Sequence, residues 1–90
     1  MSSIVVKRNG VDQPFDERKL YASLFVSLRI AKETEKTAEV IASEVVKLLK
    51  RWLEKKTHVT SHDVRNHAAF HLQEYNPSAA YVYTHHRTLS

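Results

Sequence analysis

The chain has 90 residues, of which 42% are hydrophobic. This length predicts one compact domain over residues 1–90, with its core from about 4 to 87, because domains commonly run from ~50 to ~250 residues. The absence of cysteine excludes disulfides, iron–sulfur clusters, thiolate zinc sites and cysteine nucleophiles, and it favours a cytoplasmic location. With no basic segment leading into an apolar run and no apolar stretch near ~18 residues, we expect a soluble protein without membrane contact.

The net charge is +4, from 14 Lys and Arg against 10 Asp and Glu. Such an excess favours an anionic partner, although ordinary solvated surface charge has the same composition. The positions of the basic residues therefore have to distinguish the two.

A β-hairpin is predicted over residues 4–15. The stretches 4–8 and 11–15 flank Asn9-Gly10, the dipeptide that best accepts the positive φ angles of a type I′ turn. Pro14 has no N–H and suits the edge or the end of the second strand.

Two amphipathic helices are predicted next. Asp16 stands at an N-cap position, and apolar residues follow at helical spacing as far as Ala31. A longer helical pattern begins near Thr37 and ends near Lys56. The apolar face of this second helix comprises Ala38, Ile41, Ala42, Val45, Leu48, Leu49, Trp52 and Leu53.

Two further helices are predicted in the last third of the chain. Residues Thr60 to Asp63 match a capping box, and the face behind it contains Val64, Ala68, His71, Leu72 and Tyr75. Asn76-Pro77 ends this helix and begins a fourth, with Asn76 as cap and Pro77 at the first helical position. The elements together predict an α+β fold, a small N-terminal hairpin capping a four-helix bundle, without a parallel sheet.

Lys7 and Arg8 beside the hairpin turn, with Lys19 one turn into the first helix, form a cationic group suited to a polyphosphate. Adjacent strand residues point to opposite faces, so Lys7 and Arg8 can share a ligand only at the strand end or where the strand twists. Thr60 or Ser61 at the start of the third helix offers a second anion-binding feature. The alternative is that these residues are solvated charges and ordinary helix caps.

The sequence from Val5 to Leu20 resembles the opening of the ATP-cone family, and residues 59–64 and 80–87 resemble its third and fourth helices in order and spacing. That family supplies the regulatory N-terminal domain of many ribonucleotide reductase large subunits and part of the repressor of bacterial ribonucleotide reductase genes. The resemblance implies a four-helix bundle capped by a small sheet. It also implies binding of ATP or dATP, with Mg²⁺, between the hairpin and the helices.

Carried over by position, the resemblance assigns phosphate contacts to four basic residues. Lys7 and Arg8 match the basic pair at the strand end, and Lys19 matches the lysine of the first helix. Arg87 aligns approximately with a basic residue that can reach phosphate, although Thr84-His85-His86 departs from the usual Tyr-Arg pattern.

The resemblance assigns the base and the ribose to other positions. Gln13, which replaces a frequent Glu, and Asp16 match contacts to the base or ribose edge, and Ser61 matches a hydroxyl near the base. Arg65 stands where many members carry a different polar residue. Val6 packs either near the base or in the core. These departures leave the choice between ATP and dATP open.

His67 and His71 are four residues apart, which is a metal-ligand spacing. No Glu follows His67 as a HExxH motif requires, so packed or surface histidines are the favoured interpretation. The single glycine excludes a glycine-rich phosphate loop, and no serine lies in a nucleophile-elbow context. We therefore expect no enzymatic activity.

The sequence thus favours a regulatory module that senses ATP or dATP and controls its own oligomerisation, as a homo-oligomer, or a partner protein. Such a partner would be a ribonucleotide reductase or another protein of nucleotide metabolism. One alternative is a nucleic-acid binder whose basic residues lie on the second helix. These are Lys47, Lys50, Arg51, Lys55 and Lys56. The other alternative is a structural helical adaptor without nucleotide binding.

Overall fold

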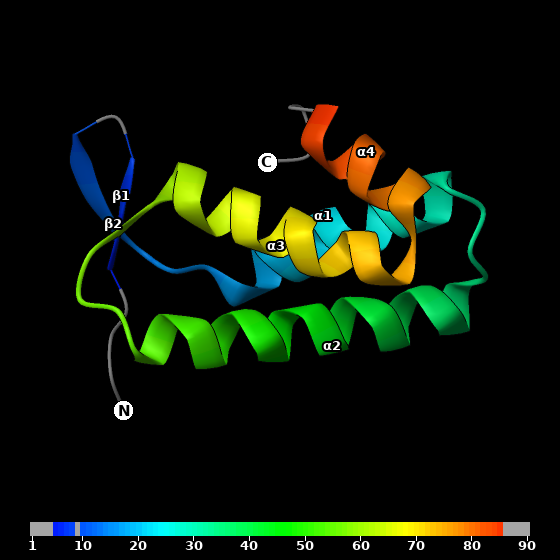
Figure 1. Cartoon of the computed structure of the whole chain (residues 1–90), viewed down its shortest axis with the longest axis horizontal. Helices are drawn as coiled ribbons and strands as arrows, with labels where there is room; N and C mark the ends of the chain where they lie inside the picture. The colour runs from blue at the N-terminus through cyan, green and yellow to red at the C-terminus, as the bar shows by residue number, and fades with distance from the viewer. Residues whose placement is uncertain (1–4, 9, 86–90) are drawn as a thin grey trace.

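The protein is a bundle of four helices with a small sheet at one end (Figure 1). This computed structural model describes residues 5–8 and 10–85, and for Val5 and Arg8 it describes the backbone alone. The α+β fold class is confirmed. Within the described part of the chain, no helix is long and apolar enough to cross a membrane.

The sheet has three strands, β1 (Val5–Arg8), β2 (Val11–Pro14) and β3 (Val59–Thr60), in the order β2-β1-β3. β1 and β2 pair antiparallel, which confirms the hairpin, and Gly10 has the positive φ of 77° that its turn requires. Asn9 lies outside the described residues.

β3 pairs with β1 in parallel, with Val6 opposite Val59, so the prediction of no parallel pairing was wrong. Parallel neighbours need a long crossover connection, and here α1 and α2 supply it. A strand of two residues carries no alternating pattern, which is why β3 was not recognised in the sequence.

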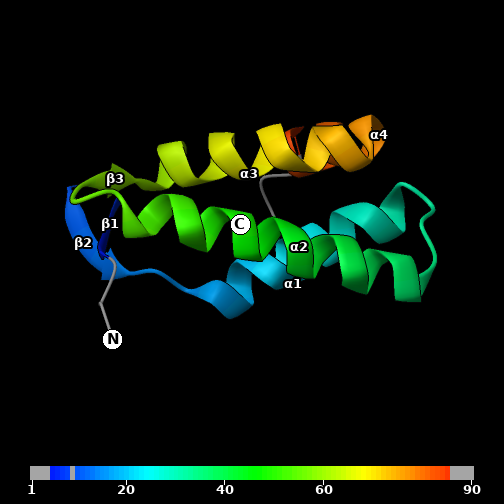
Figure 2. The same cartoon turned by 60° about the horizontal axis from the view of Figure 1, so that its bottom comes forward.

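α1 (Glu17–Ile30) and α2 (Glu35–Glu54) form an antiparallel pair that Figure 2 shows along its length. The predicted cap of α1 is confirmed, because an Asp16 carboxylate oxygen accepts from the Lys19 N–H at 3.1 Å. α2 begins two residues before the predicted position. Its cap is Thr34, whose hydroxyl accepts from the Thr37 N–H at 3.2 Å.

α3 (Ser61–Tyr75) and α4 (Pro77–His85) form the second layer. The capping box is confirmed: the Asp63 N–H donates to the Thr60 hydroxyl and the Thr60 N–H to the Asp63 carboxylate, each at 3.0 Å. Asn76 caps α4 by accepting from the Ala79 N–H at 2.9 Å, as predicted.

The core runs along the bundle axis and continues under the sheet. Leu24, Leu28, Leu49 and Leu72 are fully buried, and all lie on faces predicted to be apolar. The sheet joins the core through two further side chains, Val6 and Val59. The predicted α3 face is wrong at Tyr75, which is 45% exposed because it lies in the last turn beside the break at Asn76.

Candidate functional site

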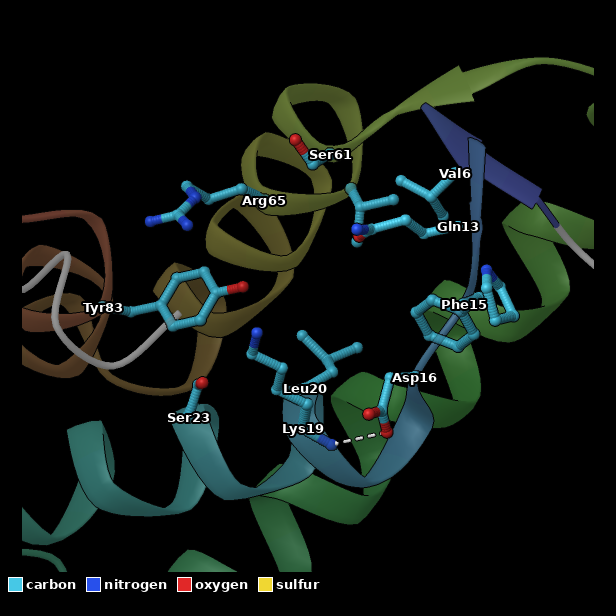
Figure 3. A pocket seen from close by; sticks show the side chains of 12 residues that line it. Val6, Gln13, Phe15, Asp16, Lys19, Leu20, Ser23, Ser61, Arg65 and Tyr83 are labelled. Carbon is cyan, nitrogen blue, oxygen red and sulfur yellow. Dashed lines mark hydrogen bonds between the residues drawn. The ribbon is translucent and has the colours of Figure 1, made fainter. Parts of the chain in front are cut away.

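A cleft opens where the sheet meets the bundle, between the end of β2, the first turns of α1 and α3, and the side of α4 (Figure 3). Its volume is about 140 Å³. The lining residues are Val6, Gln13, Pro14, Phe15, Asp16, Lys19, Leu20, Ser23, Ser61, Val64, Arg65 and Tyr83.

The inner wall of the cleft is apolar. Val6 from β1, Leu20 from α1 and Val64 from α3 are buried, and half-buried Phe15 joins them at the end of β2. These side chains come from separate elements and meet because the parallel β1–β3 contact draws the start of α3 against the hairpin. Such a wall suits a flat, apolar group such as an aromatic ring.

Cations lie on opposite sides of the opening. Lys19 is in the first turn of α1 and Arg65 is one turn into α3. In Figure 3 the Lys19 side chain and the Tyr83 hydroxyl both extend toward the space between these helices. The first turns of α1 and α3 add the positive ends of two helix dipoles. The opening therefore favours a negatively charged group.

Tyr83 is a buried residue of the cleft lining that carries a hydroxyl group. Burial raises its pKa to about 12, and the charge of Arg65 acts in the opposite direction. The side chain is 7% exposed. At neutral pH the phenol is uncharged and can both donate and accept a hydrogen bond.

Asp16 and Asp63 anchor the two helix starts. One Asp16 oxygen accepts from the Lys19 N–H, which fixes the first turn of α1 against the cleft. Hydrogen bonding with the Thr60 backbone N–H, which is the larger cause, and with the Thr60 side chain holds the pKa of Asp63 below its usual value. Ser61 directly follows Thr60 and lines the cleft, so the position of Ser61 depends on this capping box.

The structure brings six of the residues predicted for the nucleotide site together around this cleft. They are Val6, Gln13, Asp16, Lys19, Ser61 and Arg65. Val6 is 8% exposed and belongs to the core while also lining the cleft, so both of its sequence interpretations are compatible with the structure.

The remaining three residues are not in this group. Lys7 is exposed and borders a separate hollow that it shares with Asp12, His58 and Asp63. This separation from Val6 follows from the alternation of side chains along a strand. The Arg8 side chain and all of Arg87 lie outside the described residues.

Sequence reasoning missed several lining residues, chiefly Ser23, Phe15 and Tyr83. Ser23 lies one helical turn after Lys19, so the α1 periodicity held a signal for it. Tyr83 gave no such signal, because its approach to α1 and α3 depends on how α4 folds back along the bundle.

The fold and the cleft define a class: a small ligand-binding module whose cleft combines an apolar wall with a cationic opening. The sequence model of the ATP-cone domain family matches residues 3–90, and the chain belongs to this family. It is therefore a nucleotide-binding regulatory module, of a family that binds ATP and dATP. Comparisons with curated proteins and with solved structures give no significant match.

Proposed function

We propose that the chain binds ATP or dATP in the cleft between the sheet and the bundle and has no catalytic activity of its own. The observation that carries this proposal is the convergence of Lys19, Arg65 and Ser61 around an apolar wall. Adenine would pack on Val6, Phe15 and the neighbouring apolar side chains. Gln13, Asp16 and Ser61 would contact the edges of the base and the ribose.

The volume of the cleft limits how the nucleotide lies. At about 140 Å³ it is below the ~300 Å³ at which pockets for whole small molecules begin. The base therefore occupies the enclosed part, and the triphosphate lies in the open part beside Lys19 and Arg65. We assign Lys7 a smaller share of the phosphate binding than Lys19, because it borders the hollow with Asp12 and His58. Arg8 and Arg87 are proposed as further phosphate contacts.

Mg²⁺ would arrive with the triphosphate. This ion is commonly held by one or two carboxylates together with substrate phosphates and waters. Asp16 is the one carboxylate among the described residues of the cleft, and one of its oxygens accepts the hydrogen bond that caps α1. Because the other oxygen is assigned to the edge of the base or the ribose, the triphosphate and water would supply the ligands of the ion.

Regulation would follow from the construction of the cleft. Its described lining comes from β1, β2, α1, α3 and α4 and the connection between β2 and α1, so one ligand contacts elements from both ends of the sequence. A ligand shifts an equilibrium only by its differential affinity for two states. We propose that the nucleotide favours one arrangement of these elements. That arrangement then sets homo-oligomerisation or contact with a cytoplasmic partner of nucleotide metabolism, such as a ribonucleotide reductase.

Calorimetric titration of the chain with ATP and with dATP, each with Mg²⁺, tests the proposal, and GTP serves as the comparison ligand. Lys19→Ala and Arg65→Ala should each weaken adenine-nucleotide binding about tenfold, because a hydrogen bond to a charged group contributes ~1.5–3 kcal/mol.

Lys47→Ala is the matched control. Lys47 lies on α2, its side chain is 72% exposed, and it is 3.9 Å from Glu44. Its removal should leave the affinity unchanged. Equal affinities for all variants and the wild type would contradict the site assignment. Absence of nucleotide binding by the folded wild type would contradict the function itself and support the structural adaptor.

A further inference from the structure

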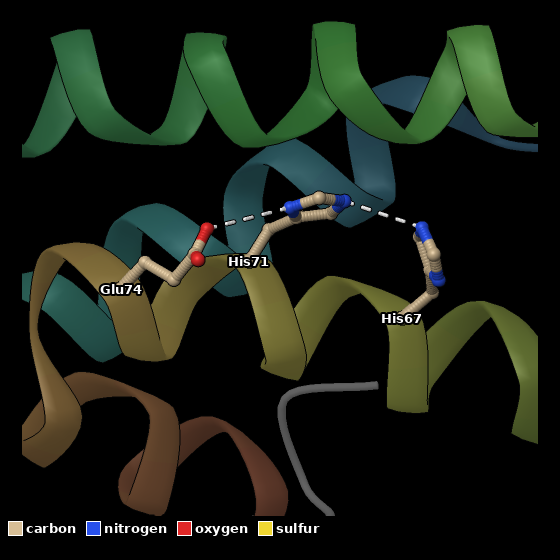
Figure 4. A network of polar contacts seen from close by, with 3 residues as sticks. All are labelled: His67, His71 and Glu74. Atoms are coloured by element: carbon tan, nitrogen blue, oxygen red, sulfur yellow. Dashed lines mark hydrogen bonds and ion pairs between the residues drawn. The ribbon is translucent and has the colours of Figure 1, made fainter.

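Two histidines of α3 lie on the side of the helix that faces α2. His67 and His71 are one turn apart and so share a face (Figure 4). Arg65, which lines the cleft, precedes His67 by two residues and is therefore about 200° away around the helix. The pair thus belongs to a different surface from the cleft.

The two imidazoles converge through the same type of nitrogen. Their Nε2 atoms are 3.2 Å apart. Two imidazole nitrogens bound to one zinc ion at ~2.0–2.1 Å lie about 2.9–3.4 Å apart for bond angles near 90–110°. The spacing fits a shared proton in an N–H···N hydrogen bond, and it also fits a metal ion that replaces this proton after a small rotation of the rings.

The other nitrogen of His71 faces a carboxylate. His71 Nδ1 is buried and has no hydrogen-bond partner among the described residues, and Glu74 Oε1 lies 3.9 Å from it. A histidine that binds a metal through one nitrogen commonly donates the N–H of the other to a carboxylate, which fixes the tautomer. The tautomer with the proton on Nδ1 leaves the Nε2 lone pair of His71 directed at His67.

His67 is held in place by packing against α2. Its ring stacks on Trp52 of α2 with centroids 4.2 Å apart and planes 11° apart. Burial, followed by the charges of His71 and Lys56, lowers the pKa of His67. This stacking holds the Nε2 atom of His67 beside that of His71.

We propose that His67 and His71 form a binding site for a divalent transition metal ion of the Zn²⁺, Ni²⁺ and Cu²⁺ group. Imidazole ligands suit these ions, and two histidines at i and i+4 on one helix face are a known zinc-binding arrangement. Among the described residues no third His, Cys, Asp or Glu joins the pair. Water therefore completes the coordination, and the site should bind more weakly than a structural zinc site with four protein ligands.

Calorimetric titration of the full chain, free of any histidine tag, with zinc chloride tests the site. Nucleotide is left out because its triphosphate chelates the metal. The expected result is one Zn²⁺ per chain. His67→Gln and His71→Gln should each weaken binding more than tenfold, and Glu74→Gln by roughly tenfold, the size typical of a lost partner of a metal ligand.

His58→Gln is the control, because His58 is exposed and precedes α3; it should bind Zn²⁺ like the wild type. Circular dichroism of each variant checks the fold, and Glu74→Gln keeps both proposed ligands in place. The electron paramagnetic resonance spectrum of bound Cu²⁺ should also show coupling to two nitrogens. Either histidine variant should lose the coupling to one of them.

Two outcomes would overturn the proposal: no Zn²⁺ binding by the folded wild type, or unchanged affinity in both histidine variants. Because the cleft residues are not involved, failure of this proposal leaves the proposed nucleotide site untouched, and the reverse also holds.

Discussion

At the scale of single residues, Tyr83 is the side chain that connects core and cleft. Its ring packs within the bundle while its hydroxyl extends toward the opening beside Lys19 (Figure 3). With a pKa of about 12 the phenol stays neutral under physiological conditions. It can therefore donate to a ribose or phosphate oxygen, or accept from a donor of the base, without adding charge to the cleft.

Tyr83→Phe should separate the packing of the ring in the core from the contact of the hydroxyl with the ligand. The ring remains, so the unfolding free energy should change little, whereas loss of the hydroxyl should weaken ATP binding roughly three- to tenfold, from ~0.5–1.5 kcal/mol per neutral hydrogen bond. Calorimetry for binding and urea unfolding for stability measure the two effects. Tyr81→Phe is the control, since Tyr81 is 65% exposed and stacks on His85 outside the cleft. Unchanged ATP affinity in Tyr83→Phe would remove the hydroxyl from the site.

At the scale of elements, Asn76 joins both layers of the bundle. Its side-chain oxygen accepts from the Ala79 N–H, and its side-chain nitrogen donates to Glu33 at 2.7 Å across the bundle. Glu33 lies in the connection between α1 and α2. One amide thus caps α4 and attaches the α3–α4 corner to that connection.

Asn76→Ala should therefore lower the unfolding free energy by more than the loss of an ordinary helix cap does. A lost cap costs about 1 kcal/mol, and the lost bond to Glu33 adds to it, for a total near 2 kcal/mol. Urea unfolding measures the change. Asn66→Ala serves for comparison, because Asn66 is exposed in the middle of α3 and its side chain bonds to His62 within the same helix. A loss of only about 1 kcal/mol in Asn76→Ala, the cost of the cap alone, would show that the contact across the bundle adds no stability.

The elements that could be predicted are those whose signals are local. Asp16, the Thr60–Asp63 box and Asn76-Pro77 each act within one turn of their own helix, and all three were recognised in the sequence. Thr34 was missed as a cap because the apolar pattern of α2 begins only at Ala38. β3 was missed because its evidence lies in a parallel partner more than fifty residues earlier in the chain.

The same distinction applies to the candidate site. Lys19 and Ser61 are placed by local helix starts, and their positions could be anticipated. The grouping of Arg65 with Tyr83 required the packing of α3 and α4 against α1. Two basic residues of α2 have acidic neighbours: Lys50 lies 3.0 Å from Glu17 and Lys47 lies 3.9 Å from Glu44. Each pair offsets part of the charge that would attract phosphates to this face of the helix.

At the scale of the whole molecule, small size makes ligand binding a large part of stability. A chain of this length buries only ~60–65% of the surface that it exposes when unfolded, so its own stability should be modest. The proposed nucleotide would bridge the sheet, α1, α3 and α4. Unfolding would then require release of the ligand.

Thermal unfolding should accordingly depend on adenine nucleotide. At a free concentration of ~100 times Kd, ATP with Mg²⁺ should add about 2.7 kcal/mol, which for a domain of this size raises Tm by roughly 10–20 °C. Lys19→Ala, measured at the same ATP concentration, should lose about 1.4 kcal/mol of this gain if its affinity falls tenfold. GTP should give a smaller shift.

Light scattering on the same samples distinguishes two sources of the gain in stability. A nucleotide-dependent increase in mass indicates linked self-association, whereas constant mass with a rise in Tm assigns the effect to the cleft alone. A Tm independent of ATP, in a protein shown to be folded, would contradict nucleotide binding.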